Sequence, residues 1–202
     1  NGVLFFDELN RCPEKLQNAL LQVLEEGKAT IGSYDVDFDV SFIFIGTMNP
    51  EDTSTEKLSD VLLDRFDVIY MDYPESTEIE KKIVAMKGKK IANVSDELLN
   101  LMVYFIRLLR SDEKLEKKPS VRASIGLYER SQSNALLKGR KAVQFEDIKE
   151  VLVSVLSHRI RLKPSVRYLQ GIEDYIKEQF HKNIEASKWQ SRLEEQETGD
   201  YR

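Results

Sequence analysis

Two acidic residues follow directly on an apolar run near the start of the chain. The run is VLFF at residues 3–6, and Asp7 and Glu8 come immediately after it. Four apolar residues closed by a polar pair predict a strand that is buried on both faces of a parallel sheet. Because such sheets bind ligands at the carboxyl ends of their strands, Asp7 can hold magnesium through water, and Glu8 can orient or deprotonate a water for attack on a phosphate. Taken alone, such a pair is more often a solvated loop.

Three further polar residues have types that suit a phosphate. Asn49 follows a second apolar run, and its amide can hydrogen-bond a phosphate and an attacking water. Arg65 ends a short predicted helix, and Arg122 lies in the first turn of another, where its charge opposes the helix dipole unless a phosphate offsets it. The guanidinium fork is planar and always charged, which suits phosphate oxygens. Each has an ordinary alternative, a turn for Asn49 and surface pairing for the arginines.

The elements that must position these residues begin with an α/β region. Three apolar runs predict strands at residues 3–6, 42–45 and 68–71. The pattern predicts a helix that starts at Pro13 and ends at Gly27, because proline suits a first turn and glycine a C-cap. Residues 28–40 alternate apolar and acidic side chains around a Gly-Ser pair, which predicts a half-exposed β-hairpin.

After Pro74 the apolar period becomes that of amphipathic helices. Five helices are predicted, around residues 79–86, 98–106, 121–138, 148–156 and 169–184. The charged stretch 111–118 is expected to be a solvated loop. We therefore predict three parts, an α/β part, a helical domain and a polar tail, at residues 1–74, 75–186 and 187–202.

The composition excludes several classes of protein. With 41% hydrophobic residues over 202 positions, the chain can bury a core and is not a disordered polymer. Its 30 basic and 35 acidic side chains give a net charge of −5, which argues against a dedicated nucleic-acid binder. The single cysteine, Cys12, excludes a disulfide scaffold and indicates a reducing compartment. No apolar run reaches the roughly 18–20 residues of a membrane span, so we predict a soluble, cytoplasmic protein without membrane contact.

Taken together, the order and spacing of these segments resemble an AAA+ ATPase from its Walker B motif onward. More narrowly, they resemble the MoxR family, kin of the magnesium-chelatase ATPase subunit. VLFFDELNR resembles Walker B, the hairpin resembles the insertion before sensor 1, and IGTMNP resembles sensor 1. LLDRFD resembles the arginine-finger segment, and PSVRAS with the later GRKAVQFEDI resembles the sensor-2 helix and the segment after it. The resemblance covers residues 3–160.

The resemblance implies a fold and a set of roles. The fold would be a partial AAA+ P-loop core of α/β type, with three strands, helices and a β-hairpin, followed by an all-α helical lid domain. Asp7 would bind Mg²⁺ through water, Glu8 would be the catalytic base and Asn49 would be sensor 1. Arg65 would be the arginine finger that reaches a neighbouring subunit's nucleotide, and Arg122 would be the sensor-2 arginine, in the same or the next subunit.

The resemblance also implies cofactors and partners. The intact protein would use ATP and Mg²⁺ in a homo-oligomeric ring, usually a hexamer. It would remodel client proteins or mature their metal cofactors, and those clients often carry von Willebrand A domains.

One required motif is absent from the 202 residues. A phosphate cradle of the form G-x-x-x-x-G-K-[ST] does not occur, since Gly27-Lys28 has Gln22 where the earlier glycine should be and no Ser or Thr after the lysine. We expect the cradle to lie upstream of residue 1, and the chain alone neither to bind ATP tightly nor to hydrolyse it. We also expect a gap in the sheet between strands 42–45 and 68–71, so that the strand half is distorted or pairs between chains.

Two other functions stay open from the sequence. The chain can be a non-catalytic protein-interaction module derived from an AAA+ ATPase. It can also be a DNA-dependent AAA+ relative, but the hairpin carries Asp35, Asp37 and Asp39 and little positive charge beyond Lys28, which suits a phosphate backbone poorly.

Overall fold

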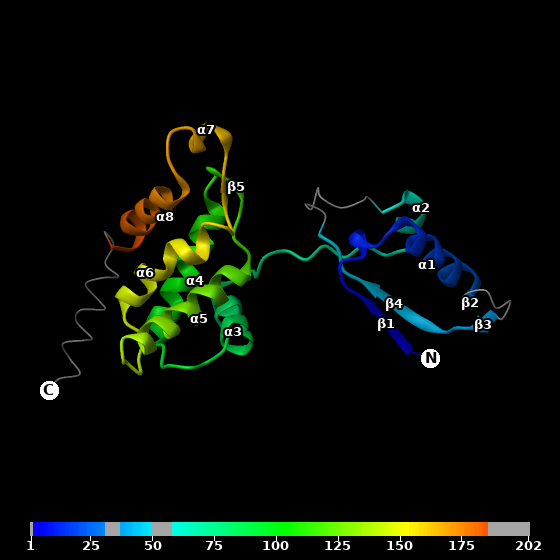
Figure 1. Cartoon of the computed structure of the whole chain (residues 1–202), viewed down its shortest axis with the longest axis horizontal. Helices are drawn as coiled ribbons and strands as arrows, with labels where there is room; N and C mark the ends of the chain where they lie inside the picture. The colour runs from blue at the N-terminus through cyan, green and yellow to red at the C-terminus, as the bar shows by residue number, and fades with distance from the viewer. Residues whose placement is uncertain (1, 31–36, 50–57, 186–202) are drawn as a thin grey trace. The chain divides into compact units, whose positions relative to one another are not determined.

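The chain divides into two compact units. The computed structural model describes residues 2–30, 37–49 and 58–185, so the hairpin tip, the link after Asn49 and the predicted polar tail lie outside the described residues. The first unit is Asn1–Tyr70 and the second is Met71–Arg202 (Figure 1). No helix among the described residues is long and apolar enough to cross a membrane.

A two-stranded parallel sheet forms the centre of the first unit. Strand β1 (Gly2–Phe6) pairs with β4 (Phe42–Gly46) in the register Val3↔Ile43 and Phe5↔Ile45. Between the two strands the chain forms a short 3₁₀ turn η1 (Leu9–Arg11), helix α1 (Glu14–Glu26) and an antiparallel hairpin of β2 (Lys28–Thr30) and β3 (Asp37–Asp39). A short helix α2 (Asp60–Leu63) follows β4. The predicted strands at 3–6 and 42–45, the helix and the hairpin are therefore confirmed.

The ends of α1 lie where the sequence predicts them. Pro13 is the N-cap residue, with the fixed φ that suits the start of a helix. Gly27 is the C-cap residue at φ 64°, a left-handed conformation that glycine adopts without steric cost, and its N–H donates to Val23 O.

Only one face of the β1–β4 sheet is covered. On that face Phe6, Phe44 and Phe66 stack with ring centroids 6.5 and 5.3 Å apart, against a small core. The buried residues of this core are Leu9, Cys12, Leu20, Leu58 and Leu62.

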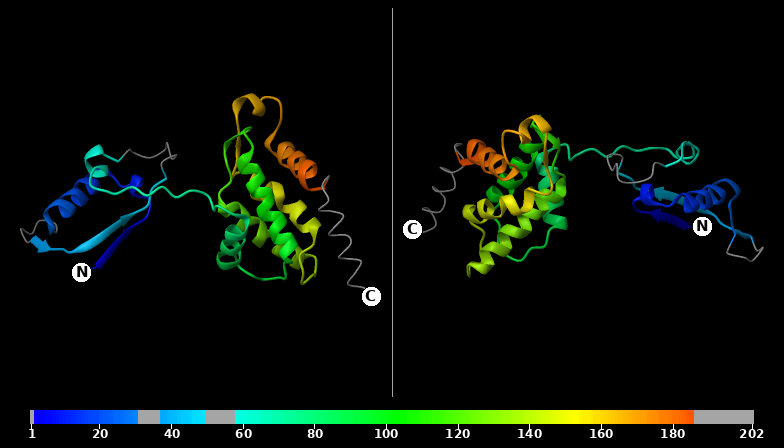
Figure 2. Two further views of the ribbon diagram at one scale, coloured as in Figure 1. Left: turned by 180° about the vertical axis from the view of Figure 1, so that it is seen from behind. Right: turned by 45° about the horizontal axis from the view of Figure 1, so that its top comes forward.

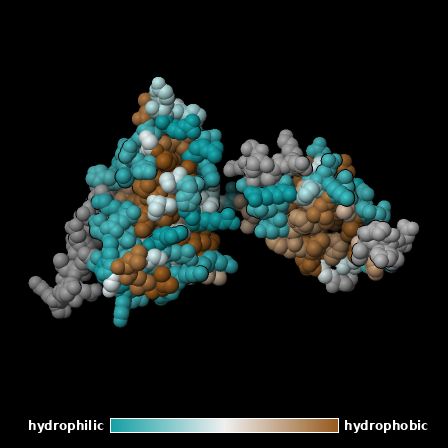
Figure 3. Space-filling model, viewed as in Figure 1, coloured by the Kyte–Doolittle hydropathy of each residue, from teal (hydrophilic) through white to brown (hydrophobic). Residues whose placement is uncertain are grey.

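The opposite face of this sheet is exposed. It consists of Val3 and Phe5 on β1 and of Ile43 and Ile45 on β4, which are 63, 60, 67 and 47% exposed. The prediction that the strand at residues 3–6 is buried on both faces is therefore wrong for this structure, because no described element packs on the second face. Figure 3 shows apolar side chains gathered at the surface of this unit. We call these four residues the bare sheet face.

The predicted third strand does not form. Residues 68–71 have no strand structure, and all four of their side chains are exposed. A strand is stable only when its N–H and C=O groups pair with a neighbour. Among the described residues, the parallel sheet contains only β1 and β4, so the segment has no strand to pair with. The expectation that another chain fills this gap stays a prediction.

The second unit is a bundle of helices, as predicted. Its described helices are α3 (Thr77–Lys87), α4 (Asp96–Ser111), α5 (Val121–Leu137), α6 (Phe145–Leu156), α7 (Pro164–Arg167) and α8 (Ile172–Phe180), and a π-helical turn η2 (His181–Glu185) follows. Ser76, Ser95 and Ser120 cap α3, α4 and α5, each accepting a hydrogen bond from a backbone N–H of the first turn. Figure 2 shows the bundle from two further sides.

A continuous apolar core holds this bundle together. Helix α4 supplies much of it, and Phe105 on α4 packs edge-on against Phe180 of α8 with ring centroids 5.1 Å apart. The fully buried large side chains of the core include Leu101, Met102, Phe105, Ile106, Leu109, Leu127, Ile148, Leu152, Leu156, Tyr175, Ile176 and Phe180. The apolar period that predicted the helices therefore marks the faces that meet in the core.

The charged stretch 111–118 is not a solvated loop throughout. Its middle forms strand β5 (Leu115–Lys117), which pairs antiparallel with β6 (Arg161–Leu162). Leu115 and Leu162 are buried in the core of the bundle, whereas Glu116 and Lys117 are exposed. The alternation of a strand allows one apolar residue to reach the core from a charged segment, so this domain is helical with one short β-ribbon.

Candidate functional site

The turns after β1 and β4 meet at the carboxyl end of the parallel sheet. The last paired residues are Phe6 and Gly46, so Asp7 and Thr47 follow side by side. The Thr47 hydroxyl donates to Asp7 Oδ1 at 2.5 Å and accepts from Glu8 N–H at 3.1 Å. The Thr47 backbone also donates to Phe6 O and accepts from Leu9 N–H. Thr47 therefore holds the acidic turn against the end of β4.

Glu8 has an unusual backbone conformation. Its φ and ψ are 56° and 51°, and among the described residues it alone is a non-glycine residue with positive φ. This left-handed conformation costs roughly 1–2 kcal/mol in a residue with a Cβ. Two hydrogen bonds to Thr47 hold the Glu8 backbone in this conformation. The Glu8 N–H donates to the Thr47 hydroxyl, and the Leu9 N–H donates to the Thr47 carbonyl oxygen. The exposed Glu8 carboxylate pairs with Arg11 at 3.2 Å.

Asn49 lies two residues beyond Thr47, at the same end of the sheet. Its carbonyl oxygen accepts a hydrogen bond from Asn10 Nδ2 at 3.3 Å, and Asn10 is buried beneath the acidic turn. The structure thus brings Asp7, Glu8 and the Asn49 backbone to one place, as the sequence predicts. Thr47 was not predicted, although its position directly after the second strand, opposite Asp7, was a usable signal.

Asp7 has the chemistry of a residue that binds Mg²⁺ through water. Magnesium prefers oxygen ligands, and it usually keeps several of its waters and binds few protein groups. Asp7 is exposed, and the Thr47 hydroxyl donates a hydrogen bond to its carboxylate. Among the described residues, no cationic side chain pairs with Asp7. The residues present therefore fit a hydrated magnesium ion.

Arg65 lies apart from the acidic turn within the first unit. It follows α2, donates to Val61 O at 2.5 Å and pairs with Glu25 near the carboxyl end of α1. Helix α1 has 13 residues, which is about 20 Å at 1.5 Å per residue, and the acidic turn precedes its start. Arg65 is therefore not brought together with Asp7 and Glu8 in this chain.

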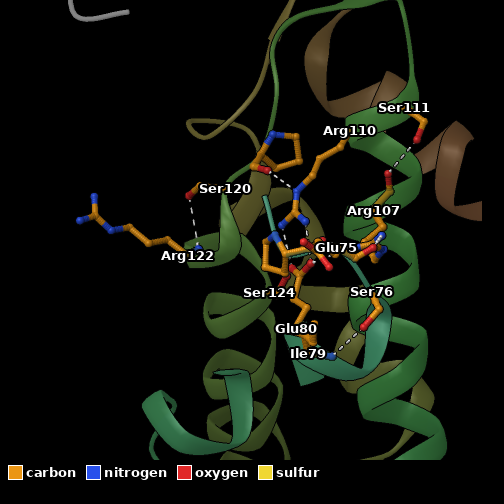
Figure 4. Close-up of polar contacts among 12 residues, drawn as sticks. Glu75, Ser76, Ile79, Glu80, Arg107, Arg110, Ser111, Ser120, Arg122 and Ser124 are labelled. Carbon is orange, nitrogen blue, oxygen red and sulfur yellow. Dashed lines mark hydrogen bonds and ion pairs between the residues drawn. The ribbon is translucent and has the colours of Figure 1, made fainter. Parts of the chain in front are cut away.

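Arg122 belongs to the second unit and is exposed there. It lies in the first turn of α5, where its N–H donates to the cap residue Ser120 at 3.3 Å. Figure 4 shows its side chain pointing away from the polar network beside it. The structure places Arg122 at the N-terminus of a helix, as predicted.

The polar network beside Arg122 was not predicted. Arg110 of α4 makes two parallel bonds to Glu80 of α3, at 2.6 and 2.7 Å, and Ser124 of α5 donates to the same carboxylate at 2.5 Å. Glu80 and Ser124 are fully buried and Arg110 nearly so. The three residues come from three helices far apart in sequence, so no local pattern indicates their contact.

Two family models match the chain, one for each unit. The first is described as the ATPase family associated with various cellular activities (AAA) and matches residues 1–68. The second is described as the AAA lid domain and matches residues 108–175. The predicted fold class, a partial AAA+ core followed by a helical lid, is thereby confirmed.

Curated relatives and solved structures agree with this assignment. The chain is 31% identical over 191 residues to the chaperone MoxR1 of Mycobacterium tuberculosis, an alignment that covers 79% of this chain and 50% of MoxR1. It is 29% identical over 189 residues to magnesium-chelatase subunit ChlI of Glycine max, covering 81% and 44%. A RuvB mutant of Thermotoga maritima shares the fold at a TM-score of 0.50 and 17% identity, covering 76% of this chain and 44% of that one.

The chain spans about half the length of these curated relatives. Within that span the acidic turn, the hairpin and the helical lid follow in the order that the resemblance implied, and both family models fall on the units that the structure separates. Both units therefore match models of the AAA ATPase family, and the chain is similar to MoxR1 and to a magnesium-chelatase subunit.

Proposed function

We propose that this chain supplies the catalytic half of an ATPase site in a MoxR-like protein. The observation that carries the proposal is the acidic turn, in which Thr47 after β4 holds Asp7 and Glu8 after β1. Residues 1–74 would be part of the core, and residues 75–186 would be the lid with sensor 2. The chain itself has no phosphate cradle and would be inactive alone.

Each residue of the acidic turn has a distinct role in this proposal. Asp7 holds the waters of a magnesium ion, and Glu8 accepts a proton from the water that attacks the γ-phosphate. Asn49 orients that water and the phosphate. A bound Mg²⁺ would neutralise the charge that develops on the phosphate oxygens. The left-handed backbone at Glu8 supports the proposal, because strained residues of this kind cluster at functional sites.

The arginines extend the proposed site to a second subunit. Arg65 is far along α1 from the acidic turn of its own chain, which suits an arginine finger that reaches the nucleotide of a neighbouring subunit. Arg122 would contact the phosphates as sensor 2. A ring of identical subunits, a hexamer in the resembling family, would complete each site, and it would act in the cytoplasm.

The work that this ATPase does would be remodelling of client proteins or maturation of their metal cofactors. The similarity to a chaperone and to a magnesium-chelatase subunit supports this proposal. Clients with von Willebrand A domains are the partners that the resemblance indicates.

The test is phosphate release from ATP by the full-length gene product, compared with the 202-residue chain. We expect turnover by the first and none by the second. Arg65→Ala should lower turnover of the assembled protein by on the order of 10³-fold, and mixing with wild-type subunits should restore part of it. Glu25→Gln, which removes the ion-pair partner of Arg65, is the matched control and should keep activity.

Two results would overturn parts of the proposal. Absence of turnover by the assembled full-length protein would contradict the ATPase function and favour a non-catalytic interaction module. That alternative has one observation in its favour, the missing G-x-x-x-x-G-K-[ST] motif in these residues. An unchanged rate in Arg65→Ala would leave the ATPase function standing and remove Arg65 from it.

A further inference from the structure

Helix α5 is held at both ends by a bidentate pair of an arginine and a carboxylate. At its amino end Arg110 binds Glu80 at 2.6 and 2.7 Å, and at its carboxyl end Arg140 binds Asp147 at 2.7 Å through both nitrogens. Both carboxylates are fully buried. Both pairs join an arginine fork to a buried carboxylate, but the Arg110 side chain is 7% exposed whereas that of Arg140 is 26% exposed.

The Glu80–Arg110 pair also holds the first turn of α5. Ser124 Oγ donates to Glu80 Oε1 at 2.5 Å, and Arg110 Nε donates to Pro119 O at 2.8 Å. Pro119 and Ser124 flank Arg122 in sequence, three residues before it and two after. The backbone that carries Arg122 is thus fixed on both sides by one ion pair (Figure 4).

The same pair holds the segment through which the chain enters the second unit. Arg110 lies over the Tyr73 ring at 4.7 Å from its centroid. Arg107, 3.7 Å from Glu80, donates to Pro74 O at 2.7 Å and to Glu75 O at 3.0 Å. Residues 73–75 follow the boundary between the units, which lies at Met71. We call residues 73–75 the entry segment and the Glu80–Arg110 pair the anchor. The entry segment and the first turn of α5 are therefore held by the same anchor.

Stability alone is a weak reason for such an anchor. Burying two charges is costly, and well-packed apolar residues often stabilise a protein as well as a buried ion pair does. What a bidentate pair adds is direction, because the planar fork of arginine accepts only a narrow range of positions for the carboxylate. An anchor shared by two segments fixes their relative orientation.

We propose that Glu80 and Arg110 are positioning residues for Arg122. They set the orientation of the first turn of α5 relative to the entry segment, so that Arg122 points in a fixed direction from the lid. The proposal rests on the proposed role of Arg122 as the arginine that contacts phosphate. Neither Glu80 nor Arg110 touches the nucleotide in this account.

The test compares the two ends of α5 in the full-length protein. Glu80→Gln and Arg110→Lys change the anchor, and Asp147→Asn and Arg140→Lys change the matched pair at the other end. The readouts are kcat and KM for ATP, with the melting temperature of each variant. We expect the anchor variants to lower kcat/KM, as Arg122→Ala should, by on the order of tenfold to a hundredfold. A small misplacement of a group that contacts the substrate has an effect of this size.

A double variant separates positioning from structure. If Glu80 acts through Arg122, Glu80→Gln in an Arg122→Ala background should cost no further activity, because the residue it positions is already gone. The Asp147→Asn variant should lower the melting temperature while leaving kcat and KM within about twofold of wild type. If Glu80→Gln does not fold, Ser124→Ala replaces it in the double variant, because it removes a single hydrogen bond to Glu80.

The outcomes distinguish this inference from the proposed function. Equal loss of activity at both ends of α5, or additive effects of Glu80→Gln and Arg122→Ala, would overturn the positioning role and leave the ATPase proposal intact. Unchanged activity in Arg122→Ala, with normal turnover by the wild type, would overturn the positioning role together with sensor 2. Absence of turnover by the wild type would overturn the proposed function itself.

Discussion

The two units of the chain differ in how they treat apolar and charged side chains. The lid buries large apolar residues from every long helix and pairs its buried charges. The first unit leaves the bare sheet face open, and it places Asp7 and Glu8 at the surface. An uncovered apolar face of this kind is a candidate contact surface. The second unit is therefore packed around its own core, whereas the first unit keeps apolar and acidic side chains exposed.

Shortening one phenylalanine in each unit should reveal this difference with the largest effect. Phe105 is fully buried against Phe180, so Phe105→Ala should lower the free energy of unfolding of the lid by about 3–5 kcal/mol. Phe5 lies on the bare sheet face, so Phe5→Ala should change stability by less than about 1 kcal/mol. Urea unfolding followed by circular dichroism measures both.

The opposite ranking would contradict the comparison. If Phe5→Ala destabilised the chain as much as Phe105→Ala, the sheet face would be covered in solution. Light scattering on the same samples would then show whether a second copy covers it.

A smaller effect tests the charged side of the comparison through pH. Burial opposes the charged form of Asp147, but hydrogen bonds from Arg140 and from Gln144 N–H outweigh it and hold the pKa of Asp147 below its usual range. A carboxylate with a lowered pKa in the folded state contributes stability above its ordinary pKa of about 4 and loses it as the pH falls further. The melting temperature of the lid should therefore fall below about pH 4.

The Asp147→Asn variant isolates this contribution. It cannot titrate, so its melting temperature should depend less on pH below about pH 4 than that of the wild type, and should already be lower at pH 7. Parallel pH profiles of the two proteins would show that other carboxylates cause the acid sensitivity of the lid.

Local rules predicted the parts of the structure that local forces determine. Apolar periodicity located the lid helices, and Pro13 and Gly27 located the ends of α1. The prediction of a strand at 68–71 was wrong because a strand needs a neighbour to pair with. The apolar residues of the segment do not show whether that neighbour is present. Strand β5 was missed because charged neighbours hide the single buried residue Leu115.

The sequence predicted that Asp7, Glu8 and Asn49 lie at one edge of the sheet, but it did not predict the contacts that hold them there. Asp7, Glu8 and Asn49 each follow an apolar run, and parallel pairing of β1 with β4 brings them to one edge. Thr47 acts through a contact 40 residues away in sequence, and Arg110 reaches Glu80 across 30 residues. Such contacts depend on tertiary packing, which spacing along the chain does not encode.

Glu8 is the base of the ATPase site that we propose. The most direct test is to measure ATP binding and ATP hydrolysis by the full-length protein that carries Glu8→Gln. The substitution keeps the size of the side chain and removes its ability to accept a proton, so we expect binding within about threefold of wild type and hydrolysis lowered by on the order of 10²-fold or more. Hydrolysis at the wild-type rate would contradict the account.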